Sequence, residues 1–461
     1  MTLPLTLQQR TALGRSRRKL LRRTDHAGWN PRHRTADPLK LLHASMRGRV
    51  PALVDLKYQR MALSPFGFFR GAVPVMASDL SLTPNTAILN QLCGDAHVSN
   101  LGAFAGLDGR VVFDINDFDE TIPGPFEWDL KRMATSILLA GREAGAKKSH
   151  CDEAAATFLE SYRLTIHKLA RMSVLDMARY QVHRLQQASP IANIFSLAQR
   201  ATPLHNLLAL TEPIPSPQPE KSSSAKPHPV LAPHPRRFKS NPPVLTRVPG
   251  TTARLVLDAL TPYVHSLLPE RRHFFTQYRP IDVAFKVVGT GSVGLRDYCI
   301  YLQGNGPHDP LFLQIKEETH SAYAPYLASS GRKLHQGRRV VEGERAMQLQ
   351  SDPFLGWTTI QGRDYLVRQL NDHKASVNLA NLKSSALFEY ALVCGEMLAR
   401  GHSRSGDPAI LAGYLGNSAR FDQAVATFAS QYADQTEKDW HQLLRSSRVK
   451  KSLAKAAPKP S

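Results

Sequence analysis

The sequence CGDAHVSN, residues 93–100, gathers polar side chains directly after an apolar run. Asp95 could orient or deprotonate a hydroxyl group, and Asn100 could give an oxygen ligand to a metal ion. Asp117 follows in INDFDE and could be a second oxygen ligand. An acid beside two oxygen ligands for magnesium is what phosphate transfer requires. The alternative is that these residues only form turns, where Asp and Asn are common.

Three acids, Asp114, Asp117 and Asp119, lie close together in FDINDFDE. Carboxylates repel one another, so such a cluster needs a cation or basic partners to hold it. Arg70, in FFRGAV, could pair with one of these acids or could contact a phosphate group. The sequence leaves both roles open.

The stretch GTGSVG contains Gly289, Gly291 and Gly294 and precedes the alternating pattern of LRDYCIYLQ. A dinucleotide-binding loop must lead into a helix, whereas this one leads into an expected strand. Strand, glycine loop and strand is the arrangement of kinase-type loops that cover nucleotide phosphates. A plain glycine-containing hairpin explains the pattern equally well.

Lys316 lies in LFLQIKEE, an otherwise apolar expected strand. A lysine there must contact an anion or extend to water. Glu342, on the following helix, could pair with it, as a helix glutamate pairs with the strand lysine of kinases. Glu344 competes for this role, and the alternative is that both glutamates face solvent.

The elements that must position these residues can be read from the sequence pattern. Asp108-Gly109 between AFAGL and RVVFDI predicts a β-hairpin with a two-residue turn, which would bring the 93–100 loop beside Asp117. EWDLKRMATSILLAGREAG, SHCDEAAATFLESYRLTIHKLARM and SALFEYALVCGEMLARGHS show helical spacing. The later half should open as a small antiparallel sheet followed by one helix, a hairpin in WTTIQGRDYLVRQL and a long helix.

Eight stretches together resemble the bacterial "domain of unknown function 2252" family over residues 45–435. They are SPFGFFRG, CGDAHVSNLGAF, FDINDFDETIPGPFEWDLKRMATS, VVGTGSVGLRDY, LFLQIKEE, RRVVEGERAMQ, DYLVRQLNDHK and LARGHSRSGD. This family resembles the superfamily of protein kinases and aminoglycoside phosphotransferases. The resemblance implies Asp95 as the catalytic base, Asn100 and Asp117 as metal ligands, and Asp119 as a possible further ligand. It also implies that Asp129, in EWDLKR, braces the catalytic loop.

The order of the motifs departs from that of kinases. The glycine loop and Lys316 precede the catalytic loop in kinases but follow it here, which implies a circularly permuted chain. The histidine that usually precedes the glycine of the catalytic loop is also absent, because Leu92 and Cys93 stand before Gly94. The expected fold is therefore α+β and kinase-like, with a small antiparallel β lobe and a larger, mainly helical lobe.

The expected function is an ATP- and magnesium-dependent phosphotransferase acting on an unknown hydroxyl acceptor, a small molecule or a protein. ATP would lie beneath Gly289, Gly291 and Gly294, with Lys316 on its phosphates and Glu342 holding Lys316. Two alternatives stay open. One is a non-catalytic, nucleotide-binding pseudokinase. The other is a metal-dependent phosphoesterase built on five side chains: Asp95, His97, Asp114, Asp117 and Asp119.

The net charge of +21 is concentrated near the ends of the chain and in one internal segment. We expect basic tails at residues 1–45 and 441–461, which could bind polyanions weakly. Residues 206–247, rich in proline and serine, should be a flexible linker between a catalytic-loop half, 46–205, and a glycine-loop half, 248–440.

The composition also bears on whether the protein is a membrane, secreted, disulfide-rich or zinc-binding protein. No apolar run is long enough to span a membrane, and the first residues lack the pattern of a secretory signal. The four cysteines lie far apart and form no CxxC pair, which argues against a disulfide framework or a zinc site. A cytoplasmic protein is expected.

Overall fold

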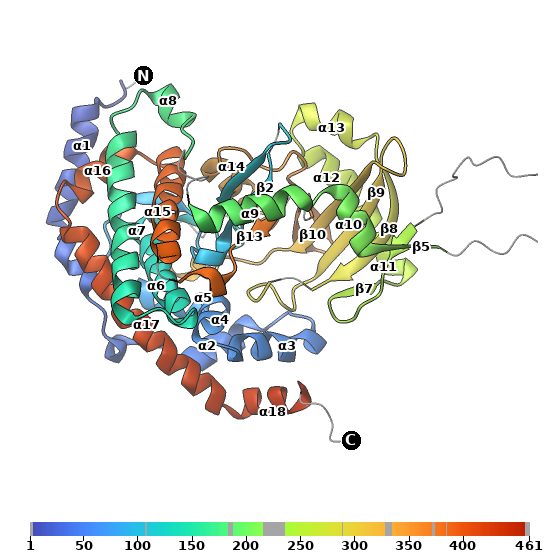
Figure 1. The fold of residues 1–461 in the computed structure, drawn as a ribbon, viewed down its shortest axis with the longest axis horizontal. Helices are drawn as coiled ribbons and strands as arrows, with labels where there is room; N and C mark the ends of the chain where they lie inside the picture. The colour runs from blue at the N-terminus through green and yellow to red at the C-terminus, as the bar shows by residue number, and fades with distance from the viewer. Residues whose placement is uncertain are drawn as a thin grey trace, which may run out of the picture.

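The computed structural model describes residues 3–106, 108–182, 188–214, 236–287, 289–327, 334–370, 374–383 and 385–456. The fold is mixed α+β, with 55% helix, 16% strand and small antiparallel sheets, as expected. Long helices gather on one side of the molecule and the largest sheet lies on the other (Figure 1). We call these two parts the helical body and the sheet region.

The sheet region contains six antiparallel strands in the order β11-β12-β10-β9-β8-β7. The strands expected on both sides of the glycine loop, the strand of LFLQIKEE and the later hairpin are all present. The bounds are β7 (Leu245–Arg247), β8 (Arg279–Lys286), β9 (Asp297–Gln303), β10 (Pro310–Glu317), β11 (Gly356–Ile360) and β12 (Arg363–Gln369).

Different elements pack on the two faces of this sheet. Side chains alternate between the faces along a strand, and Leu313 and Ile315 of β10 pack in a cluster with Tyr263 and other residues of three helices. Phe312 and Lys316 lie on the opposite face. The covering helices are α11 (Gly250–Asp258), α12 (Leu260–Ser266) and α13 (Pro269–Phe275).

The opposite face is partly covered by residues that the sequence placed in a flexible linker. Helix α10 (Pro203–Leu210) and strands β5 (Thr211–Pro213) and β6 (Arg236–Phe238) pack there. Leu207, Phe238 and Phe312 belong to one buried cluster. The Phe238 N–H donates to Asp282 Oδ2 at 2.7 Å. The linker expected over 206–247 is therefore wrong for its two ends, because their apolar side chains bury against the sheet. Residues 215–235 lie outside the described residues.

The helical body contains the three helices expected from their spacing. Helix α7 packs against α6 and α15, and α17 packs against α6 and α7; Figure 1 shows α6, α7 and α15 side by side. Phe126, Tyr162 and Phe421 form part of the core. The bounds are α6 (Glu127–Glu143), α7 (Lys148–Leu169), α15 (Ser385–Ser405), α16 (Pro408–Leu415) and α17 (Arg420–Arg445).

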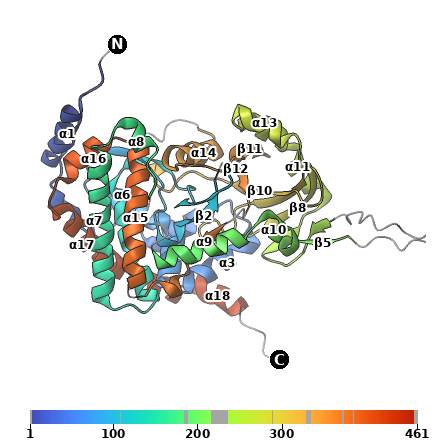
Figure 2. The ribbon, with the colours of Figure 1, turned by 45° about the horizontal axis from the view of Figure 1, so that its top comes forward.

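Short strands connect the helical body to the candidate site. Strand β1 (Leu89–Leu92) pairs with β4 (Ile122–Pro125), and β2 (Leu101–Ala105) pairs with β3 (Val111–Ile115). The expected β2–β3 hairpin is confirmed, but its connection is longer than two residues. Strand β13 (Ala375–Ser376) adds to β2, and helix α9 (Ser189–Arg200) packs on β2 between the two parts of the molecule (Figure 2).

The amino-terminal segment differs from the loose tail that its charge suggested. Arg18 donates to the carbonyl oxygens of Gly413 and Tyr414. Arg34 forms ion pairs with Asp79 and Asp439, at 2.7 Å each. The arginines thus join this segment to the helical body. Its helices are α1 (Leu7–Ser16) and α2 (Pro38–Ser45), followed by α3 (Pro51–Ala62), α4 (Pro65–Gly71) and α5 (Val73–Ser81).

The remaining helices are α8 (Val174–Ala178), α14 (Gln336–Met347) and α18 (Ser447–Ala456). Helix α18 packs on α3, so the carboxy-terminal segment is also folded over its described part. None of the helices in the described ranges is long and apolar enough to cross a membrane. All four cysteines are buried and free.

Candidate functional site

The loop after β1 is held by helix α6. Asp129 accepts hydrogen bonds from the backbone N–H groups of Cys93 and Gly94, at 2.8 and 3.0 Å. Gly94 has φ of +83°, and a Cβ atom there would lie 2.2 Å from the carbonyl oxygen of Glu120. Only glycine fits at this position, since the conformation and the close approach both exclude a side chain. Asp129 therefore braces the loop that carries Asp95, as the resemblance implied.

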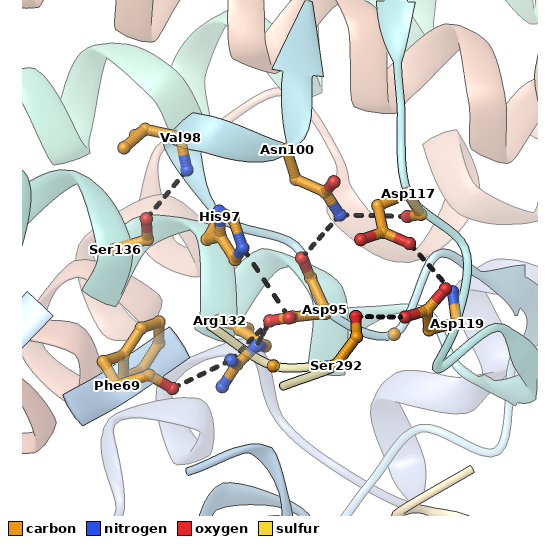
Figure 3. Close-up of polar contacts among 12 residues, drawn as sticks. Phe69, Asp95, His97, Val98, Asn100, Asp117, Asp119, Arg132, Ser136 and Ser292 are labelled. Carbon is orange, nitrogen blue, oxygen red and sulfur yellow. Dashed lines mark hydrogen bonds and ion pairs between the residues drawn. The ribbon is translucent and has the colours of Figure 1, made fainter. Parts of the chain in front are cut away.

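Asp95 is fixed by one buried guanidinium group. Arg132 donates to Asp95 Oδ1 from Nε at 2.7 Å and from Nη2 at 2.5 Å. The Arg132 guanidinium also lies over the ring of Phe69, 4.2 Å from its centroid. Figure 3 shows Oδ1 directed toward Arg132 and the other oxygen toward His97. Because Arg132 engages Oδ1, Oδ2 is the oxygen available to a hydroxyl group.

His97 is a neutral neighbour of Asp95. Its Nε2 lies 3.6 Å from Asp95 Oδ2, and its side chain is buried. Burial lowers the pKa of His97 to about 3, although the Asp95 charge opposes this shift. The imidazole is therefore uncharged at neutral pH.

Asn100 joins the loop to the acidic segment. Its Nδ2 donates to the carbonyl oxygens of Asp95 and Asp117, at 3.0 and 2.9 Å (Figure 3). Both hydrogen bonds use the amide nitrogen, so Oδ1 is the atom that could ligate a cation. The β2–β3 hairpin positions these residues, since the Asn116 N–H donates to the Asn100 carbonyl.

Lys316 lies directly on the acidic segment. Its Nζ is 2.5 Å from both carboxylate oxygens of Asp119 and 3.5 Å from Asp117 Oδ1. Burial disfavours the ammonium, but Asp117 and Asp119 raise the pKa of Lys316 above its ordinary value. Burial also opposes ionisation of Asp117, yet Lys316 holds the pKa of Asp117 below its usual range. The site therefore contains a permanent cation among acids.

The glycine loop connects β8 to β9 and leads into a strand, which excludes the strand-to-helix arrangement of dinucleotide folds. Ser292 Oγ donates to Asp119 Oδ2 at 3.2 Å (Figure 3). The loop thus contacts the acidic segment from the other half of the chain. Gly294 has φ of +90° and marks the end of the turn.

One cavity of about 330 Å³ lies between the loop of Asp95, the acidic segment and the glycine loop. Its lining includes Asp95, Asp117 and Asp119 on one side and Gly289, Gly291 and Ser292 on another. Segments nearly 200 residues apart in sequence therefore meet, although Lys316 and Asn100, which the hypothesis also placed at this cavity, do not line it.

Glu342 does not pair with Lys316, so this prediction is wrong. Its side chain is half-exposed and accepts from Arg338 Nε at 2.7 Å. The glutamate turned inward on α14 is Glu344, which is buried beside Arg368 and not Lys316. The partner of Lys316 is Asp119, because the acidic segment, and not α14, lies against this end of β10.

Helix α14 instead supplies a basic residue to the site. Arg339 donates to the carbonyl oxygens of Asp119, Thr121 and Thr319, at 2.8, 2.5 and 2.9 Å. It thereby fixes the backbone of the acidic segment. The sequence analysis missed Arg339 because a buried arginine bound to carbonyl oxygens has no local sequence signal. Arg132 did have one, since it lies three residues after Asp129 and on the same side of α6.

Asp114 is separate from the other acids. It forms a buried ion pair with Arg400 of α15, and neither side chain lines the cavity. The phosphoesterase hypothesis needs Asp114 in one metal cluster with the other acids. Within the described ranges, no group of three or more His, Cys, Asp or Glu side chains is placed to hold a metal ion by itself.

Asp297, a buried carboxyl group beside the site, makes the stability of the folded protein depend on pH. It lies opposite Lys316 in the β9–β10 pair and is 2% exposed. Burial raises the pKa of Asp297 to about 7, and the Lys316 charge only partly offsets this. The folded protein therefore keeps a proton that the unfolded chain releases near pH 4, to within about a unit. Stability should fall as the pH rises from that value toward 7.

We expect Asp297→Asn to remove the share of this fall that Asp297 contributes, because an amide cannot ionise. Burial also raises the pKa of Glu344 to about 7, so Glu344 keeps its own share. At pH 8 the variant should be more stable than the wild type by on the order of a few kcal/mol. Urea unfolding across this pH range measures the effect, with the exposed Asp258→Asn as the matched control. An unchanged pH profile in Asp297→Asn would show that Asp297 is not the titrating group.

The geometry defines a class of site in which a glycine loop and a group of acids line one cavity, and a strand lysine contacts two of these acids directly. The sequence profile of the family described as "Uncharacterized protein conserved in bacteria (DUF2252)" matches residues 49–446. The chain belongs to this family. No curated protein and no solved structure matches the chain.

Proposed function

We propose that the protein is an ATP-dependent phosphotransferase with a circularly permuted, two-lobed kinase-like fold. The sheet region would be the smaller lobe and the helical body the larger one. The proposal is supported mainly by one observation: Lys316 Nζ lies within 3.5 Å of both Asp117 and Asp119, and these two acids line one cavity with Asp95 and the glycine loop.

The residues present fit a magnesium ion that enters with a nucleotide. Asp117 is partly exposed beside the cavity, and Asn100 has one amide oxygen available. Magnesium in nucleotide sites is held by one or two protein oxygens together with phosphate oxygens. Asp117 and Asn100 Oδ1 would be these protein ligands, and Asp119 a possible third. The ion would neutralise charge on the transferred phosphate.

The chain's own groups would then have separate roles. Lys316 would exchange Asp119 for nucleotide phosphate oxygens beneath the glycine loop. Asp95 Oδ2 would orient the acceptor hydroxyl and take its proton as the hydroxyl oxygen bonds to the γ-phosphorus. The bond between that phosphorus and the β–γ bridging oxygen breaks, and ADP leaves. Arg132 would keep Asp95 in place through Oδ1.

A non-catalytic nucleotide-binding protein is the second candidate. The contact of both Asp119 oxygens with Lys316 favours it, because the lysine is already neutralised. Nucleotide binding without any phosphate transfer would support this candidate, and phosphate transfer would exclude it.

Binding of a non-hydrolysable ATP analogue with magnesium tests the proposal by titration calorimetry. Asp117→Asn should lose most of the magnesium dependence, and Lys316→Met should weaken binding roughly tenfold or more through loss of charge-assisted hydrogen bonds. Asp108→Asn, on the exposed hairpin connection, is the matched control. Wild-type affinity in both site variants would refute the proposal.

A further inference from the structure

We infer that Lys57 and Arg70, from the amino-terminal helices, form an anion subsite that binds a phosphate group of the acceptor. Both side chains line the same cavity as Asp95. The acceptor would be a small phosphorylated molecule with a free hydroxyl group. The role of this molecule as acceptor rests on the proposed function, whereas the anion subsite itself rests on the burial and contacts of Lys57 and Arg70.

Lys57 is a buried ammonium group without an acidic partner. It lies on α3 and is 2% exposed. Its Nζ donates to the carbonyl oxygen of Gly291 at 2.5 Å. Among the described residues, no carboxylate lies within ion-pair distance of it. Burial and the nearby Arg49 lower the pKa of Lys57 well below its ordinary value, so an anion in the cavity would favour its charged form.

Arg70 has unused hydrogen-bonding capacity at the same wall. It is the last basic residue of α4, and its Nε is buried with no hydrogen-bond partner among the residues described. Arg10, Arg271, Arg345, Arg400 and Arg404 also have a buried Nε without a partner among these residues, but none of them lines the cavity, whereas Arg70 does. A guanidinium group with free donors suits a phosphate or carboxylate oxygen.

The cavity lining carries charges of both signs. Arg47 and Arg49 lie beside Lys57 and Arg70 in its lining, and together these side chains make a basic wall contributed by residues 47–70. The acids and the glycine loop come from other segments. A ligand with a phosphate at the basic wall would present a hydroxyl group toward Asp95.

Two binding measurements on the full-length protein test this subsite. The first titrates inorganic phosphate in the presence of saturating non-hydrolysable ATP analogue and magnesium. The second titrates the analogue itself. The variants are Arg70→Gln and Lys57→Met, with exposed Arg254→Gln as the control of equal charge change. Circular dichroism checks the fold, and Arg70→Gln alone suffices should Lys57→Met fail to fold.

We expect phosphate to bind the wild type and the control, and to bind Arg70→Gln roughly tenfold more weakly or worse. In Arg70→Gln the analogue affinity should change by no more than about twofold. Lys57→Met is compared for phosphate only, because Lys57 also donates to Gly291 of the glycine loop. Absence of phosphate binding, or equal phosphate affinity in Arg70→Gln, overturns the subsite. A parallel loss of analogue affinity also overturns it, because the wall would then serve the nucleotide. Should the wild type bind no analogue, the proposed function fails, while the phosphate titration still decides the subsite.

Discussion

Replacement of Asp95 by asparagine is expected to lower phosphate transfer from ATP by about a hundredfold or more, because the carboxylate that accepts the hydroxyl proton is lost. Affinity for the ATP analogue should stay within about twofold, since Asp95 does not contact the nucleotide in the proposed arrangement. Transfer of radiolabelled γ-phosphate to water and to a panel of small phosphorylated alcohols measures the effect. Equal rates in Asp95→Asn and wild type would exclude Asp95 as the base.

The control for this prediction must separate chemistry from folding. Arg132 is fully buried, and its partner in the structure is Asp95. Loss of one member of a buried ion pair costs about 3–5 kcal/mol, so the variant should also be less stable. A thermal unfolding curve should therefore show that Asp95→Asn is still folded at the assay temperature. Asp108→Asn, which removes one carboxylate from the exposed hairpin connection, controls for the change in charge.

Replacement of Arg34 by methionine is expected to destabilise the protein by about 3 kcal/mol or more, because it leaves two buried carboxylates without their cation. Arg34 contacts both Asp79 and Asp439, each 3% exposed. Tyr432 also donates to Asp79, so the network links the amino-terminal segment to α5 and α17. Urea unfolding at pH 7 measures the loss.

Arg32→Met is the matched control for Arg34→Met, because Arg32 is exposed and should change stability by no more than about 0.5 kcal/mol. Deletion of residues 1–45 should destabilise more than Arg34→Met, since it also removes the contacts of α1 with α16. A truncated protein as stable as the wild type would show that this segment is an accessory after all.

Much of the fold could be predicted from periodicity. The alternating runs around the glycine loop and the helical spacing of EWDLKRMATS and SALFEYALVC specify their structures locally. Asp95 and Asp117 could be expected to meet because one hairpin joins their segments, whereas the place of Lys316 beside them was expected only from the resemblance to kinases. Positions decided by distant partners could not be predicted. Glu342 and Glu344 differ by two residues, and only the packing of α14 selects which one is buried.

The local net charge of a segment was the poorest guide to whether that segment is folded. The sequence of residues 1–45 reads as a basic tail because its partners, including Asp407, Asp439 and the carbonyl oxygens at the end of α16, lie about 400 residues later. The linker prediction over 206–247 was wrong at its ends for a similar reason. Phe238 is surrounded by proline and lysine in sequence, and only the sheet offers it a buried position.

The chain order of the site has a consequence for biosynthesis. Asp119 leaves the ribosome 197 residues before Lys316, and Arg34 precedes Asp439 by 405. Until those late residues emerge, Asp117 and Asp119 lack the ammonium group of Lys316, and Arg34 can pair only with Asp79. Nascent chains that stop before α17 therefore cannot reach the native state and become substrates for chaperones and proteases. Only a chain that includes both Lys316 and α17 contains all the partners of these charged groups.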